Sequence, residues 1–215
     1  IKKAINIPLT IKIRTGWDQQ TRNADEVVKI AYNEGVAWVA IHGRTRAEAY
    51  TGLADWDYIA QVKSRAQLPI LGNGDILTAQ QAVHRVKSSG CDGVLIGRGC
   101  LKNPHIFADA LALWNEQKLD STVDRDYVTL YRQLYDVLKL YGIKNGDDRI
   151  LQIQLKKFAS WFATGFPGAS QFRKNIFQLK ATNDVLEEAL AFFSSIQKIE
   201  QEDTSQDGFL MGGHG

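Results

Sequence analysis

Apolar runs alternate with polar segments at a regular interval over the first half of the chain. Four short polar signatures end these runs, at residues 12–14, 42–44, 72–75 and 97–99. They recur every 24 to 31 residues, and a strand, a loop, a helix and a return loop together take roughly 25 to 35 residues. The spacing therefore predicts consecutive βα units with polar groups at the carboxyl end of every strand. In a βα barrel, that end carries the active site.

The pattern inside each unit distinguishes strands from helices. Thr78 with Gln81 forms a capping-box signature, Gly35 and Gly90 end helices, and Pro104 suits the first turn of another helix. The last strand is apolar throughout, so we expect it to be buried on both faces. The sequence predicts strands at 9–14, 37–42, 69–72 and 93–96, and helices at 23–35, 55–65, 78–90 and 103–114.

The pattern changes after the polar segment 117–123, where we place a domain boundary. From there to about residue 196, apolar residues recur at helical spacing, which predicts a bundle of about four helices. We therefore expect a βα domain at 1–116, an all-α domain at 121–202 and a disordered tail at 203–215.

Composition narrows the class of protein. The chain has 215 residues, of which 44% are hydrophobic and 23% charged, and it has no apolar run near 18 residues. Its two cysteines, Cys91 and Cys100, form neither a disulfide framework nor a metal-ligand pattern, and no secretory signal is present. We expect a cytoplasmic protein with one or two domains, without bound metal, membrane attachment or an obligate protein partner.

Glycine-rich turns follow the third and fourth predicted strands. Phosphate needs backbone N–H donors and a cation, and glycine lets the backbone approach closely. Gly97 and Arg98 meet this need, and Asn73, Gly74 and Asp75 supply a second such turn. The pair predicts a phosphate or cofactor site, since the last two loops of a βα barrel commonly hold phosphate. The alternative is that both are tight turns without a ligand.

Cationic side chains occupy one face of the first predicted strand. Lys12 and Arg14 alternate with apolar residues, and His42 ends the next strand. A buried amine needs an anionic partner, which the pyrimidine edge of a flavin would supply; a carboxylate inside a barrel is the alternative. His42 is either part of the same site or a structural histidine.

The predicted helical part carries the basic excess of the chain. The formal net charge is only +2, but residues 125–180 contain ten Lys or Arg against four Asp or Glu. Aromatic residues lie among these cations, as they do on RNA-binding surfaces, although a solvated basic face beside an aromatic core gives the same pattern. The candidate cations are Lys156, Lys157, Arg173 and Lys174.

These residues resemble the tRNA-dihydrouridine synthase family, and within it the bacterial B-type branch. The resemblance implies an FMN-binding TIM (βα)8 barrel, of which only the last four βα units are present, followed by a helical tRNA-binding domain. It is carried by residues 9–17, 41–46, 50–56, 72–76, 90–99 and 103–104, and more loosely by 165–168 and 172–173.

The resemblance also assigns roles to the candidate residues. NADPH would reduce FMN, which would deliver a hydride to a uracil of tRNA, while a cysteine donates a proton. Lys12 and His42 match residues beside the flavin's pyrimidine edge, and the two glycine turns match segments that hold its ribityl phosphate. Arg14 and Arg44 would meet the substrate or its phosphates. The basic helical residues would contact tRNA.

The family's catalytic cysteine lies in a Gly-Cys-Pro motif that this chain does not contain. We therefore expect no catalytic residue within these 215 residues, and no activity from them alone. Two alternatives stay open: an FMN-dependent TIM-barrel oxidoreductase for a small molecule, or a non-catalytic RNA-binding half barrel.

Overall fold

A computed structural model describes residues 1–119, 125–142 and 148–204. They divide into two compact units: Ile1–Cys100 with Ile106–Lys118, and Leu101–His105 with the described residues from Leu119 onward. From residue 205 on, the expected tail lies outside the described residues. Within the described ranges, every helix is too short or too polar to cross a lipid bilayer.

The first unit is built on a four-stranded parallel sheet with the strand order β1-β2-β3-β4. Each strand follows its neighbour in sequence, as in consecutive βα units. The strands are β1 (Thr10–Arg14), β2 (Trp38–His42), β3 (Ile70–Asn73) and β4 (Gly93–Leu95). The helices are η1 (Lys2–Ala4), α1 (Ala24–Asn33), α2 (Trp56–Arg65), α3 (Ala79–Ser89) and α5 (Ile106–Trp114). The residues of a short helix, α4 (Gly99–Lys102), are divided between the two units.

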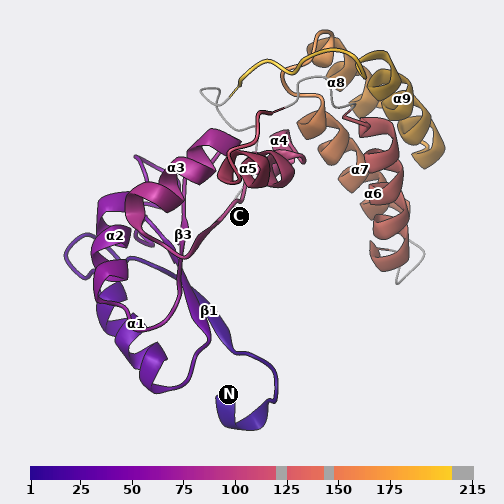
Figure 1. The fold of residues 1–215 in the computed structure, drawn as a ribbon. Coiled ribbons are helices and arrows are strands. Elements are labelled where there is room, and N and C mark those ends of the chain that lie inside the picture. Colours follow the sequence, from indigo (N-terminus) through magenta and orange to yellow (C-terminus); the bar gives the residue numbers. More distant parts are fainter. Residues whose placement is uncertain (120–124, 143–147, 205–215) are drawn as a thin grey trace. The chain divides into compact units, whose positions relative to one another are not determined.

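One face of this sheet packs against helices. Helices α1, α2 and α3 run along the same side of the strands (Figure 1). Val39, Ile41 and Ile70 point to that side and are fully buried, together with Ile59 of α2. Because side chains alternate along a strand, Lys12, Arg14 and the other residues two apart from them point to the opposite face. The sheet therefore has an apolar face covered by helices and a mixed face, on which Leu71 and Leu95 lie beside the polar residues.

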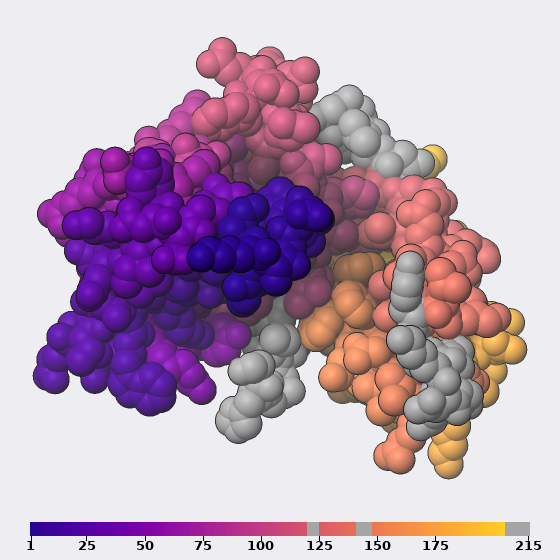
Figure 2. All heavy atoms as spheres, turned by 90° about the horizontal axis from the view of Figure 1, so that it is seen from below, coloured from indigo at the N-terminus to yellow at the C-terminus, as the bar shows by residue number. Residues whose placement is uncertain are grey.

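The outer strands are less buried than the sequence pattern predicts. All three residues of β4 are only partly buried, so the expectation of a strand covered on both faces is wrong for this structure. Lys12 in the middle of β1 is exposed. Both strands have a single neighbour in the sheet. The N-terminal segment before β1 also lies at the surface, with Ile1 and Ile7 exposed (Figure 2).

Several helix ends are set by the residues that the sequence analysis identified. Thr78 and Gln81 form the complete capping box of α3, and Gly90 ends that helix in the left-handed conformation at φ +67°. Asp55 caps α2 by accepting a hydrogen bond from the Tyr58 amide. Pro104 is an exception, because α5 begins only at Ile106 and the short α4 precedes it.

The second unit contains four helices among its described residues. They are α6 (Tyr127–Gly142), α7 (Asp148–Phe162), α8 (Ala169–Gln178) and α9 (Thr182–Ser195). Their core is aromatic: Tyr127, Tyr131 and Phe193 are at most 1% exposed. The Tyr131 hydroxyl donates a hydrogen bond to the Leu155 carbonyl at 2.9 Å, which satisfies a polar group that would otherwise be costly to bury.

Candidate functional site

Strand register brings the candidate residues of the first unit into one row. Arg14 pairs with His42, His42 with Asn73, and Asn73 with Leu95, so one residue from each strand lies at the same level. All four lie at the carboxyl ends of their strands, on the face opposite the helices. The sequence signatures that lie about 30 residues apart are therefore neighbours across the sheet.

A pocket of about 380 Å³ lies at this edge of the sheet. It brings together all the predicted cofactor residues and also Arg14. Its lining residues are Lys12, Arg14, His42, Tyr50, Asn73, Gly74, Asp75, Ile76, Leu77, Leu95, Ile96, Gly97 and Arg98. We call it the cation pocket, because four of these side chains are basic or imidazole groups and a single one is a carboxylate.

Lys12 and His42 lie among the cations of the cation pocket, and Asp75 is the lining carboxylate whose charge acts on His42. No described residue forms a hydrogen bond or ion pair with either side chain. Lys12 is exposed as a residue, but partial burial of its ammonium group, and then the charge of Arg14, lower its pKa from the usual value. Burial, followed by the charges of Arg14, Lys12 and Arg44, lowers the pKa of His42 to about 4. At neutral pH His42 is therefore a neutral imidazole in a positively charged surrounding that favours an anion.

Asp75 is the carboxylate that balances part of this charge. Its Oδ1 accepts hydrogen bonds from Arg44 at 2.8 Å and Arg98 at 3.3 Å, and its Oδ2 accepts the Ala54 amide at 2.7 Å. Burial alone would raise the pKa of this carboxyl, but the hydrogen bonds and the two arginine charges hold it below its usual value. Asp75 is therefore an ionised carboxylate that holds the guanidinium groups of Arg44 and Arg98 in position.

Arg14 and Arg44, to which the resemblance assigned substrate contacts, bind backbone carbonyls in the structure. Arg14 Nη1 donates to the carbonyls of Thr45 and Ala49 at 2.8 and 3.0 Å. Arg44 is 3% exposed, and it donates to the carbonyls of Thr51 at 2.9 Å and Gly52 at 2.5 Å as well as to Asp75. Both guanidinium groups thus hold the backbone of the loop 45–54, which follows β2.

The glycines of the two turns serve different purposes. A Cβ at Gly72 would lie 2.3 Å from the Trp56 ring, and the indole N–H of Trp56 donates to the Gly74 carbonyl at 3.0 Å. A Cβ at Gly74 would lie 3.0 Å from the His42 ring, in a backbone with φ +127°. At Gly97, by contrast, a Cβ would meet nothing within 4 Å. Gly72 is therefore explained by packing, whereas Gly97 leaves backbone open to the pocket.

Two further side chains of the cation pocket are Asn73, whose amide nitrogen already has a hydrogen-bond partner, and the aromatic residue Tyr50. Asn73 Nδ2 donates to the Leu95 carbonyl at 2.7 Å, so its amide oxygen is the group that can face a ligand. Tyr50 lines the cation pocket, and the Arg98 guanidinium carbon lies 5.0 Å from its ring centroid. A role of Tyr50 was not predictable from the residues, because an aromatic residue within a polar loop has no periodic signal.

The basic candidates of the second unit fall into two groups. Lys156 is 8% exposed, and its ammonium donates to the carbonyls of Phe177 and Leu179 at the end of α8. That geometry makes Lys156 a cap of α8, in the position where cations stabilise helix ends, and contradicts its assignment as a surface contact for tRNA. Lys157 and Lys174 are exposed, and Arg173 is partly buried.

Metal chemistry receives no support from the described parts of the chain, where no three His, Cys, Asp or Glu side chains cluster as ligands. The cysteines lie outside the cation pocket. Cys91 is buried, and the Cys100 thiol donates to the Gly97 carbonyl at 3.0 Å. Burial raises the pKa of both thiols.

Comparisons with known proteins show the family of this chain. Residues 1–197 match the family model described as dihydrouridine synthase (Dus). A probable tRNA-dihydrouridine synthase of Rickettsia prowazekii is 35% identical over 90% of this chain and 58% of its own length. The tRNA-dihydrouridine synthase B of Pseudomonas syringae pv. tomato is 36% identical over 89% of this chain and 56% of its own length.

A probable tRNA-dihydrouridine synthase of Mycobacterium leprae is also 36% identical, over 83% of this chain and 46% of its own length. The chain thus spans between about half and three fifths of these curated relatives. The strand-end signatures that form the cation pocket all lie inside the matched residues. This chain belongs to the dihydrouridine synthase family.

Proposed function

We propose that the chain is the FMN-binding and tRNA-binding part of an enzyme that reduces uridine to 5,6-dihydrouridine in tRNA, with NADPH as the reductant. One observation carries the proposal. The cation pocket gathers Lys12, His42 and Arg98 around space at the carboxyl ends of parallel strands, in a chain of the dihydrouridine synthase family. A parallel sheet binds ligands at this edge.

The four βα units form half of a (βα)8 barrel in this proposal, with residues 1–116 as the half barrel. Two features support it. Strands β1 and β4 each have one neighbour and are incompletely buried, as strands do that lack a partner on one side. The relatives in the comparison are also longer than this chain. Four further units would cover both edges.

FMN fits the residues that line the cation pocket. Its phosphate is a dianion, and Arg98 with the open backbone at Gly97 suits it. The amide oxygen of Asn73 can accept a hydrogen bond from the cofactor, because its NH₂ group is bound to Leu95. Asp75 holds Arg98 in place, and Gly74 keeps the backbone close to His42. Bound in this pocket, FMN would supply the hydride for the uracil.

The redox edge of the cofactor belongs with Lys12 and His42. Lys12 is an ammonium without a partner among the described residues, so it can bind negative charge on a pyrimidine ring. His42 is neutral at physiological pH, and a neutral imidazole can donate from one nitrogen and accept at the other. Together they would orient the ring and stabilise its reduced, anionic form.

The proton for the uracil comes, in this proposal, from a cysteine outside these 215 residues. Neither Cys91 nor Cys100 lines the cation pocket, and both have a raised pKa, which disfavours the reactive thiolate. We therefore expect Cys91→Ser and Cys100→Ser to retain activity in the full-length protein.

The all-α domain, residues 121–202, is proposed to bind tRNA. Its exposed cations Lys157 and Lys174, with Arg173, are suited to phosphate contacts. Lys156 is left out of this surface, because its ammonium is bound to backbone carbonyls.

The cofactor assignment is tested by the flavin content of the purified full-length protein. We expect yellow protein, and we expect Lys12→Ala and Arg98→Ala each to lower the flavin-to-protein ratio. Arg65→Ala is the matched control, because Arg65 is an exposed cation of α2 outside the pocket. Unchanged flavin content in both pocket variants would show that the pocket is not the cofactor site.

The reaction is tested with an unmodified tRNA transcript, NADPH and the full-length protein, by measuring dihydrouridine in the digested RNA. Flavin reduction by NADPH is followed separately by the loss of flavin absorbance without oxygen. A flavoprotein that neither binds nor modifies tRNA would instead favour the reduction of a small molecule. Protein without flavin that binds tRNA would favour the non-catalytic alternative.

A further inference from the structure

Two loops at the carboxyl edge of the sheet are joined through their backbones. The loop 15–23 follows β1, and the segment 43–55, which contains the loop 45–54, follows β2. The Arg46 amide donates to the Gly16 carbonyl at 2.9 Å, and the Ala47 amide donates to the Trp17 carbonyl at 2.8 Å. A Cβ at Gly16 would lie 2.5 Å from the Thr21 carbonyl oxygen, so the first loop is tightly folded. The two loops therefore form one fixed platform.

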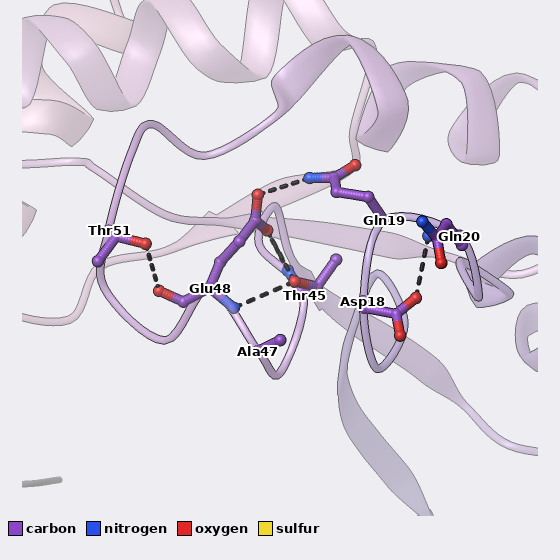
Figure 3. A pocket seen from close by; sticks show the side chains of 7 residues that line it. All are labelled: Asp18, Gln19, Gln20, Thr45, Ala47, Glu48 and Thr51. Atoms are coloured by element: carbon purple, nitrogen blue, oxygen red, sulfur yellow. Dashed lines mark hydrogen bonds between the residues drawn. The ribbon is translucent and has the colours of Figure 1, made fainter.

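A second hollow, of about 420 Å³, opens between these loops (Figure 3). We call it the loop hollow. It is distinct from the cation pocket, since the two share no lining residue. Its lining residues are Asp18, Gln19 and Gln20 from the first loop and Thr45, Ala47, Glu48 and Thr51 from the second.

Part of this lining builds the hollow itself. Glu48 accepts hydrogen bonds from the Thr45 amide at 2.7 Å, the Thr45 hydroxyl at 2.9 Å and Gln19 Nε2 at 2.5 Å (Figure 3). Backbone and side-chain bonds from Thr45 outweigh the effect of burial and lower the pKa of Glu48. Glu48 is therefore a bound anion that ties the two loops together.

Other polar groups of the hollow have no partner. The Gln20 side-chain amide forms no hydrogen bond with a described residue, and Asp18 accepts its bonds from Gln20 and Thr21 through Oδ1, which leaves Oδ2 open. The hydrogen bonds from Thr21 and Gln20 lower the pKa of the Asp18 carboxyl, so it is ionised at neutral pH. None of the seven described lining residues is Lys or Arg.

This lining selects a neutral ligand rich in hydrogen-bonding groups. A phosphate group would meet two carboxylates and no cation inside the hollow. Nucleobase amino groups and ribose hydroxyls, in contrast, donate to carboxylates, and a side-chain amide such as Gln20 can both donate to and accept from a base edge. The volume also suits one nucleoside, since small-ligand pockets begin at about 300 Å³.

Two exposed side chains belong to residues that adjoin the lining residues in sequence. Trp17 directly precedes the lining residues and is 68% exposed, with no ring contact to a described residue. Arg46 lies between the lining residues Thr45 and Ala47, and its side chain is exposed with no bond to a described residue. Exposed aromatic rings stack on unpaired bases, and arginine binds the adjoining phosphate.

We propose that the loop hollow binds one unpaired nucleoside of the RNA substrate, which stacks on Trp17, hydrogen-bonds to Gln20 and Asp18, and has its phosphate next to Arg46. This second nucleotide site deepens the proposed function and rests on it. Because the platform also carries Tyr50 of the cation pocket, the site would set which nucleotides accompany the uridine that enters that pocket.

The test is the binding of an unmodified tRNA transcript to the full-length flavoprotein, measured by fluorescence anisotropy. We expect Trp17→Ala and Gln20→Ala each to weaken binding about 5- to 100-fold, the range for loss of a base-stacking or base-edge contact. Trp17→Phe should retain most of the affinity. Gln61→Ala is the matched control for Gln20, because Gln61 is an exposed glutamine on α2. Flavin content should be unchanged in all four variants.

The outcomes separate this inference from the proposed function. If Trp17→Ala and Gln20→Ala both bind tRNA with wild-type affinity, and the wild type forms dihydrouridine, the second site alone is overturned. Weakened RNA binding in the variants, with no dihydrouridine formed by the wild type, would support the site and overturn the reaction. A wild-type protein that does not bind tRNA would overturn both.

Discussion

Arg44→Ala tests how the loop 45–54 is held at the mouth of the cation pocket. Arg44 is 3% exposed and donates to two loop carbonyls and to Asp75. The substitution leaves the carbonyls of Thr51 and Gly52 without their donor and removes one of the two cations that bind Asp75. We therefore expect it to lower the free energy of unfolding and to loosen the loop.

The magnitude follows from the bonds that are lost. A hydrogen bond contributes about 1 kcal/mol net, or about 1.5–3 kcal/mol when one partner is charged, and Arg44 makes three such bonds. Asp75 keeps Arg98 and the Ala54 amide, and its side chain is 21% exposed, so solvent screens part of the lost charge interaction. We expect a loss of roughly 3–5 kcal/mol, the range for breaking a buried ion pair.

The assay is urea unfolding of the full-length protein, followed by circular dichroism, with hydrogen exchange of residues 49–55 as the local measurement. Exchange should accelerate at the amides of Thr51, Ala54 and Asp55, whose acceptors belong to this loop or to its anchors. Arg46→Ala is the control, because Arg46 is exposed on the same loop, and should change stability by no more than about 0.5 kcal/mol. If Arg44→Ala matches that control in both measurements, the proposed role of Arg44 is wrong.

Three further changes separate packing, charge and surface roles. Gly72→Ala should cost about 1–3 kcal/mol of stability, because the added Cβ clashes with the Trp56 ring. Gly97→Ala should keep the melting temperature of the wild type and lower the flavin content. Equal melting temperatures of the two variants would contradict this reasoning. The pKa of His42 is lowered to about 4, so the unfolded chain binds the extra proton between pH 6.5 and 4 and stability falls as pH falls. His42→Gln should remove up to about 3 kcal/mol of that pH dependence, measured by urea unfolding at several pH values; an unchanged slope would refute it. Lys156→Met should lower stability by about 1–3 kcal/mol and retain the affinity for tRNA. Lys174→Ala should retain stability and lower the affinity for tRNA. If Lys156→Met instead lost tRNA affinity at unchanged stability, Lys156 would belong to the RNA-binding surface.

Local physics made much of the first unit predictable. Alternation in β1 separates Lys12 from its apolar neighbours, and Thr78 with Gln81 marks the start of α3 in sequence as it does in the structure. Each signal involves residues within four positions of one another, so the sequence contains both partners. The prediction that β4 is buried on both faces was wrong, because burial depends on which elements lie beside a strand, and an apolar run carries no such information.

The residues of the candidate site also include some that were predictable from the sequence and some that were not. Lys12, His42, Asn73 and Arg98 were found because strand-end signatures converge at one edge of a parallel sheet. The bonds of Arg14 and Arg44 to the loop 45–54 were not predictable, since the acceptors are backbone carbonyls, and every residue has a carbonyl. The position of Lys156 was not predictable for the same reason: its partners are backbone carbonyls, and in sequence a lysine that caps a helix looks like a lysine on the surface.

The way in which the arginines hold the loop 45–54 has a consequence for the surface that the loop presents. Arg14 and Arg44 bind carbonyls at Thr45, Ala49, Thr51 and Gly52, and therefore fix the path of the loop without reference to its side chains. Exposed positions such as Leu53 are free to change while the backbone keeps its course. A chain with other side chains at these exposed positions would thus present a different chemical surface from the same backbone path.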